Sequence, residues 1–136
     1  MNEETVLLRQ VHPRFIQNGR VTSQAFRPTP KDDDRLSVYD GDQICAEDSW
    51  AHYTTDLGLA SAGVLGVTVA ECGAAGLPVH ADPGPFPEHA VIDFATKSNS
   101  QTDVAAKALR ASAQSRDWLY VPTRAPSRIL WKREMA

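Results

Sequence analysis

Cysteine is scarce in this sequence, which has only Cys45 and Cys72 among its 136 residues. Neither lies in a CxxC motif, so the chain offers no disulfide framework and no ligand set for a zinc finger. No apolar run approaches the roughly 18 residues that a membrane-spanning helix needs. The start, Met1-Asn2-Glu3-Glu4, is acidic and lacks the basic and then apolar profile of a secretory signal. These absences predict a cytoplasmic protein that uses no membrane segment.

Motifs that hold nucleotides or metals are also missing. The glycines of segment 58–66 form neither a GxGxxG pattern nor a P-loop pattern, which disfavours dinucleotide-binding folds and P-loop enzymes. His80, Asp82, Glu88 and His89 are possible metal ligands that lie close together in the chain. They match no HExxH-like spacing, however, and three prolines lie between them. We therefore predict no metal and no cofactor.

Basic residues are not in excess, because the net charge is −3, and this disfavours nucleic-acid binding by charge alone. The charges are nevertheless uneven along the chain. Residues 31–56 carry eight acidic and two basic side chains, and residues 97–136 carry eight basic and three acidic ones. Blocks of opposite sign can steer a partner or pair with each other, although solvated faces are the usual fate of charged residues. The basic C-terminal block leaves nucleic-acid binding open without favouring it.

Apolar alternation and turn signals predict a single compact α+β domain over residues 1–121. Two main helices are expected, over about 46–57 and about 102–116, the second with a capping box that begins at Ser100. Because strands and helices do not alternate regularly, the sheet should be mixed or mainly antiparallel, with about five to six strands. The apolar run 63–69 is the candidate for a central strand. Other extended segments are expected at 5–11, 20–26, 36–39, 77–80, 89–94 and 118–121.

The segment 122–136 is predicted to be a basic C-terminal tail that docks on the domain or on a partner. In it, Trp131 stands beside Lys132 and Arg133, and Arg128 precedes them. Tryptophan and arginine are enriched among the residues that contribute most to protein–protein binding. We therefore predict that these four residues bind a protein partner. The oligomeric state stays open.

His12 and His89 are the candidates for catalysis, because each borders a proline-containing turn at the end of a predicted strand. If the two strands are neighbours, the imidazoles could act as base and acid on a phosphodiester. Arg9 or Arg20 would then neutralise charge in the transition state. The commoner role of such histidines is structural, as turn residues that are hydrogen-bonded to the backbone. His52 is assigned to the solvent-facing side of the first helix.

Two functions from different classes follow from these features. The first is the binding of a macromolecular partner by a small accessory, antitoxin-like or immunity-like protein. Its motivating features are the acidic loop and the basic aromatic tail. The alternative is a nuclease-like enzyme that cleaves a phosphodiester without a metal, through the histidine pair. A pocket shared by both histidines and the two arginines would favour the enzyme, and dispersed side chains would favour the binding protein.

Overall fold

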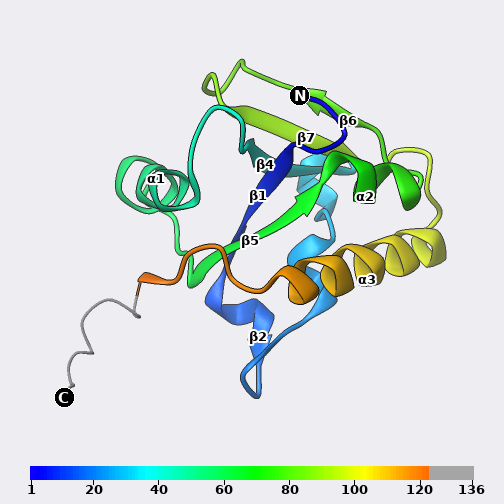
Figure 1. Ribbon diagram of the computed structural model, residues 1–136. Helices are drawn as coiled ribbons and strands as arrows, with labels where there is room; N and C mark the ends of the chain where they lie inside the picture. The colour runs from blue at the N-terminus through cyan, green and yellow to red at the C-terminus, as the bar shows by residue number, and fades with distance from the viewer. Residues whose placement is uncertain (123–136) are drawn as a thin grey trace.

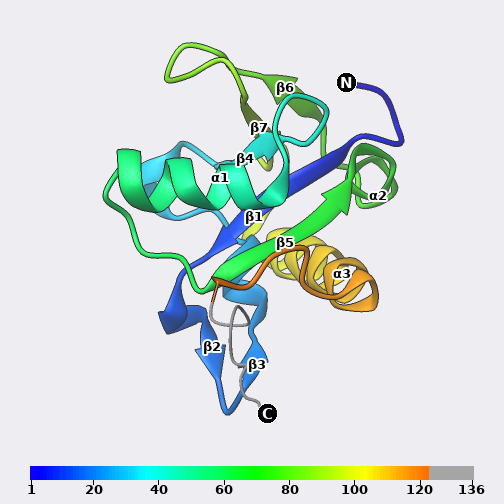
Figure 2. The ribbon, with the colours of Figure 1, turned by 60° about the vertical axis from the view of Figure 1, so that its left-hand side comes forward.

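The computed structural model describes residues 1–122 and contains a five-stranded sheet in which every neighbouring pair is antiparallel (Figure 1). A separate two-stranded hairpin projects from one end of this sheet (Figure 2). The predicted α+β class with a mainly antiparallel sheet is confirmed. The order of the main strands is β5 (Gly63–Thr68), β1 (Val6–Val11), β4 (Arg35–Asp40), β7 (His89–Asp93) and β6 (Val79–Ala81), and the hairpin consists of β2 (Ile16–Gln17) and β3 (Arg20–Val21).

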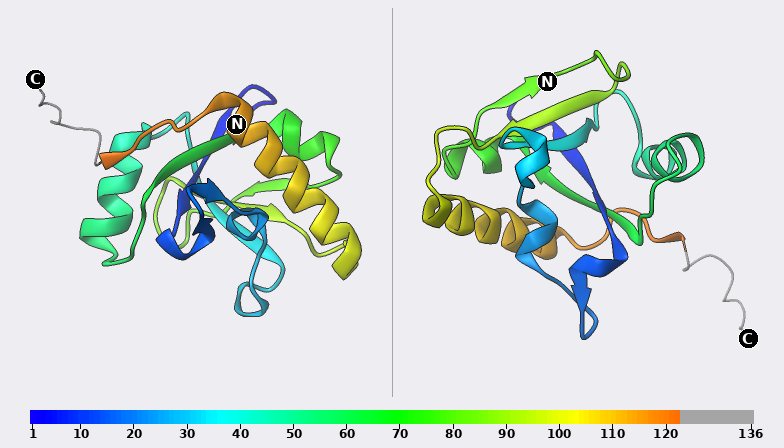
Figure 3. Two further views of the ribbon diagram at one scale, coloured as in Figure 1. Left: turned by 90° about the horizontal axis from the view of Figure 1, so that it is seen from below. Right: turned by 180° about the vertical axis from the view of Figure 1, so that it is seen from behind.

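Helices cover both faces of the sheet, with α1 (Ala46–Ala51) on one side and α3 (Asn99–Arg116) on the other (Figure 3). The predicted extended segment 20–26 is a strand only at Arg20–Val21 and then turns into a short 3-10 helix. Within residues 1–122, no helix combines the length and the apolar character that crossing a membrane requires. The α-helices are α1 (Ala46–Ala51), α2 (Val69–Ala74) and α3 (Asn99–Arg116). The other helical turns are η1 (Pro13–Phe15), η2 (Ser23–Phe26), η3 (Pro30–Asp32) and the π-helical η4 (His52–Asp56).

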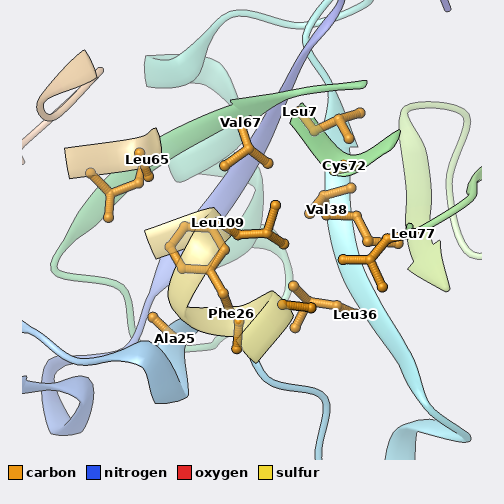
Figure 4. Packing of buried hydrophobic residues seen from close by; sticks show 14 of the residues in the cluster. Leu7, Ala25, Phe26, Leu36, Val38, Leu65, Val67, Cys72, Leu77 and Leu109 are labelled. Atoms are coloured by element: carbon orange, nitrogen blue, oxygen red, sulfur yellow. The ribbon is translucent and has the colours of Figure 1, made fainter. Parts of the chain in front are cut away.

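The larger hydrophobic core lies between the sheet and α3. Leu7 of β1, Phe26 of η2 and Leu109 of α3 are at most 1% exposed, and Figure 4 shows them in one cluster. Burying a large apolar side chain contributes roughly 1.5–3 kcal/mol, so this cluster dominates the stability of the fold. Because strand side chains alternate between faces, Leu8 points to the other side, where it packs in a smaller cluster with Tyr39 and α1.

Strands β1 and β4 pair with each other over fewer residues than each pairs with its other neighbour in the sheet. Six residue pairs join β1 to β5 and five join β4 to β7. Only Leu7–Asp40 and Leu8–Tyr39 join β1 to β4. The sheet therefore opens between β1 and β4 beyond these pairs. An opening of this kind exposes backbone polar groups that need other partners.

Helix α3 begins three residues earlier than predicted. Its N-cap is Ser98 and not Ser100: Ser98 Oγ accepts from Gln101 N–H at 3.2 Å, and Gln101 Oε1 accepts from Ser98 N–H at 2.9 Å. Both serines suit a capping box, but the earlier start places Thr102 inside the helix, where it is buried. The predicted end at Arg116 is confirmed.

Strand β5 lies at an edge of the sheet, whereas the sequence predicted a central strand. The predicted last strand, 118–121, is reduced to one bridge between Val64 and Tyr120 that covers this edge. Val64 N–H donates to Tyr120 O, and Leu119 N–H donates to Val64 O, both at 2.9 Å. Gly66 permits the close approach, since a Cβ there would lie 2.6 Å from the Leu119 side chain. The segment around Tyr120 covers the edge of β5, and the layers of helices cover its two faces. This burial explains why an edge strand can be apolar along nearly its whole length.

Glu71 connects α2, α3 and β5. Its Oε1 accepts from Thr68 N–H at 2.8 Å, and its two carboxylate oxygens accept from Arg116 at 3.1 and 2.9 Å. The same guanidinium donates to Gly66 O at 2.9 Å. Burial alone would raise the pKa of Glu71, but the hydrogen bonds from Arg116 and Thr68 outweigh it and hold the pKa below its ordinary value.

We expect Glu71→Gln to lower the free energy of unfolding by about 1–2 kcal/mol at pH 7. A carboxyl group whose folded pKa is depressed gives stability that is present above its unfolded pKa and lost as the pH falls through the folded pKa. The difference between wild type and variant should therefore shrink in acid, as measured by urea unfolding at several pH values. Glu4→Gln is the control, because the Glu4 side chain is exposed and makes no hydrogen bond within residues 1–122. A difference that does not change with pH would contradict the role of this carboxylate.

Candidate functional site

Arg9 of β1 bridges the opening between β1 and β4. Its Nε donates to Ala25 O of η2 at 2.7 Å, and its Nη1 donates to Ser37 O of β4 at 2.9 Å. The side chain thus supplies a donor to a β4 carbonyl where strand pairing has ended. Burial lowers the pKa of Arg9, while the nearby Tyr53 and Asp32 act in the opposite direction. The guanidinium remains charged at neutral pH.

A pocket of about 280 Å³ lies over this opening. That volume is close to the lower end of the range for small-molecule sites. Arg9, Ser37 and His89 contribute polar groups to its wall. The apolar side comes from β4, the helical segment after α1 and the loop before β7, through Tyr39, Tyr53, Leu57, Leu59 and Phe86.

The imidazole of His89 is held between a carboxylate and a hydroxyl. Its Nδ1 lies 2.9 Å from the main-chain oxygen of Asp82 and 3.3 Å from Asp82 Oδ2. Its Nε2 lies 3.1 Å from Ser37 Oγ. A carbonyl oxygen can only accept, so Nδ1 carries the proton of the neutral ring and Nε2 is left to accept from the Ser37 hydroxyl. This order of groups is that of a nucleophile, its base and a residue that orients the base.

The sheet register brings these three residues together. Tyr39 pairs with His89 and Ser37 pairs with Val91, so Ser37 and His89 are diagonal neighbours on one face. Asp82 follows β6, and its N–H donates to His89 O at 2.9 Å, which closes the hairpin between β6 and β7. Three prolines restrict the connecting loop. His89 is 8% exposed, whereas Ser37 is exposed, so a ligand in the pocket can reach the hydroxyl.

His52 was assigned to solvent from the sequence, and the structure corrects this. Its Nδ1 lies 2.8 Å from the Tyr39 hydroxyl, and its ring is 4.6 Å from that of Phe86. The predicted helix 46–57 ends as the π-helical turn η4, in which Leu57 N–H donates to His52 O at 3.0 Å. The wider turn changes the side-chain directions that an α-helical period predicts. Burial raises the pKa of Tyr39, so its hydroxyl keeps the proton that it can donate to His52.

His12 and Arg20 do not share the pocket that Arg9 and His89 line. His12 caps η1, where its Nδ1 accepts from a backbone N–H at 3.0 Å. His89 stands in the row of the sheet that passes through Leu8. His12 follows Leu8 by four residues, which is roughly 13 Å along the strand direction, and it lies two strands away. Arg20 is exposed in the hairpin. The structure therefore does not bring the proposed histidine pair together.

The residues predicted to bind a partner, Arg128, Trp131, Lys132 and Arg133, lie outside the described residues. Partner binding by the predicted tail 122–136 therefore stays a prediction. In the part of the chain that the structure describes, no group of three or more histidine, cysteine, aspartate or glutamate side chains is arranged to hold a metal ion.

Sequence reasoning did not select Ser37, and it noted Asp82 only as a possible metal ligand. Ser37 occupies the polar position of an alternating apolar strand, which was a usable signal. Its contact with His89 spans 52 residues, however, and depends on the pairing of β4 with β7. By contrast, the contact between Asp82 and His89 joins residues only seven positions apart, within the hairpin of β6 and β7.

The chain matches no protein-family model, and no curated protein or solved structure is detectably similar to it. Any function must therefore be argued from the geometry of the site.

We expect Arg9→Met to lower the free energy of unfolding by about 2 kcal/mol or more, because it leaves two carbonyl groups without their donors. Chemical denaturation measures the loss. Arg20→Met is the matched control, since Arg20 is exposed, and a change within about 0.5 kcal/mol is expected for it. Equal effects of the two substitutions would contradict the bridging role of Arg9.

Proposed function

We propose that this protein is an ester hydrolase in which Ser37 is the nucleophile, His89 the base and Asp82 the residue that orients the base. The observation that carries the proposal is the hydrogen-bonded chain from Asp82 through His89 to Ser37, together with the tautomer that it selects. Ser37 is an exposed residue that lines a pocket of about 280 Å³, where a substrate can be held beside it.

In the proposed reaction, Ser37 Oγ attacks the electrophilic centre of the ester while its proton moves to His89 Nε2. The imidazolium then gives this proton to the departing alcohol. A water molecule, deprotonated by the same nitrogen, cleaves the ester of Ser37 and restores the hydroxyl. The Asp82 carboxylate, 3.3 Å from Nδ1, favours the imidazolium that forms in each half of the cycle.

The proposal keeps His89 from the enzymatic alternative drawn from the sequence and replaces His12 with Ser37. Partner binding through the basic C-terminal segment stays a separate prediction, which no contact within residues 1–122 supports. As part of this proposal we place the protein in the cytoplasm. Its two cysteines are both free, as is usual in a reducing compartment.

A fluorophosphonate probe, which esterifies activated serine hydroxyls, tests the nucleophile directly. We expect intact-mass spectrometry to show one adduct on the wild type and none on Ser37→Ala. Ser115→Ala is the matched control, because Ser115 is also exposed but lies on α3, and it should be labelled like the wild type. A Ser37→Ala protein that is folded and still labelled would overturn the assignment.

Hydrolysis of p-nitrophenyl acetate tests the base. We expect His89→Gln to reduce the rate by about 100-fold or more. His80→Gln should have no effect, because His80 is an exposed neighbour that faces Asp93. Asp82→Ala should cost less than His89→Gln, since it removes the carboxylate but keeps the main-chain oxygen that fixes the tautomer. A His89→Gln variant that retains the wild-type rate would exclude His89 as the base.

A further inference from the structure

Among the residues that the structure describes, no carboxylate pairs with the charge of Arg9 at close range. Both of its hydrogen bonds go to neutral main-chain oxygens, and none of the ion pairs within residues 1–122 includes it. Asp32 lines the same pocket and favours the charged form of Arg9, but it lies beyond ion-pair distance. Since carbonyl groups are the acceptors that Arg9 bonds within residues 1–122, an anionic ligand in the pocket would add a partner of opposite charge to this half-buried cation.

The position of this charge relative to the nucleophile is fixed. Arg9 Nη1 donates to the main-chain oxygen of Ser37 itself, so the guanidinium sits beside the residue whose hydroxyl would react. Within the described residues, Nη2 makes no hydrogen bond, and it remains able to donate to a ligand. Nη1 also keeps a second N–H, so Nη1 and Nη2 can together donate to the oxygens of a phosphate or a carboxylate.

The rest of the pocket suits an uncharged ring or a short hydrocarbon. Tyr39, Tyr53 and Phe86 line it with Leu57 and Leu59, and the Tyr39 and Phe86 rings lie 5.1 Å apart. A ligand that reaches both sides would therefore place an apolar group against these rings and an anion against Arg9.

We propose that the site takes esters that carry an oxyanion group, phosphate or carboxylate, next to the bond that is cleaved, with Arg9 binding the oxyanion and the aromatic wall binding an apolar substituent. This inference rests on the proposed function of Ser37. In a phosphodiester the negative charge would lie on the reacting phosphate itself. In an ester that also carries a free carboxylate group, the charge would lie on a neighbouring carbon.

Isothermal titration calorimetry with three small probes tests the proposal without any reaction. Phenylphosphonate and benzoate carry the anion on a phenyl ring, and benzyl alcohol carries no charge. We expect at least one anion to bind at least about tenfold more tightly than benzyl alcohol at low ionic strength. Added salt should weaken this preference. Tighter binding of phenylphosphonate would identify a phosphate substrate, and tighter binding of benzoate a carboxylate. Equal binding of all three probes would overturn the proposal.

Substitutions at the pocket wall give a second test that does not disturb the Arg9 bridge. Asp32→Asn keeps an oxygen for the bonds that Asp32 accepts from Thr29 but removes its negative charge, so the anions should bind about threefold more tightly. Asp33→Asn is the control, because Asp33 is exposed and does not line the pocket, and it should bind them like the wild type. Indistinguishable affinities of these two variants would contradict the proposal.

Further variants separate this inference from the hydrolase proposal. Ser37→Ala should bind the anion like the wild type, whereas Arg9→Lys, checked for folding by circular dichroism, should lose about tenfold in affinity. If the anion binds but the fluorophosphonate does not label Ser37, the hydrolase proposal fails and only the anion site at Arg9 remains. If Ser37 is labelled but the anion binds no better than benzyl alcohol, only the inference about the substrate fails.

Discussion

Arg9 supplies a hydrogen bond to β4 where β1 and β4 no longer pair with each other. Where strands part, carbonyl and N–H groups lose their partners, and leaving them buried and unpaired is costly. The guanidinium reaches Ala25 O on one side and Ser37 O on the other, so η2 and β4 are held at fixed distances from β1. The opening is therefore a defined feature of the sheet. Its position determines where the pocket, the exposed hydroxyl and the positive charge lie.

The aromatic groups around the opening keep His89 in place. Its ring lies 5.1 Å from that of Phe86, which in turn contacts Tyr39 and His52. The π-helical turn η4 makes this possible, because it carries His52 to Tyr39 and adds Tyr53 to the pocket wall. A ring packed on one side and hydrogen-bonded at both nitrogens has little rotational freedom, which is what a positioned base requires. The same packing leaves Ser37 at the surface.

The predictable part of this protein is the part that local sequence determines. The strand at 5–11, the helix at 102–116 and the proline-rich loop before β7 follow from alternation, periodicity and turn residues. The predicted start of α3 was wrong because Ser98 and Ser100 both suit the N-cap position. The candidate site was largely missed, because Ser37 lies beside His89 only through the pairing of β4 with β7. These strands are far apart in the sequence, and no local pattern predicts which strands are neighbours in the sheet. His52 was misplaced for a related reason: an α-helical period cannot anticipate a π turn.

Under the proposed chemistry, the two charged groups near the hydroxyl act in opposite directions until a substrate arrives. Asp82 favours the imidazolium that forms when His89 takes the Ser37 proton, whereas the positive charge of Arg9 opposes it. An anionic substrate would offset the charge of Arg9 and leave the field of Asp82 at His89 unopposed. A neutral ester gives no such compensation. The arginine that bridges the opening in the sheet would therefore make proton transfer more favourable with an anionic substrate than with a neutral one. Binding of the substrate and activation of the nucleophile would then depend on the same residue.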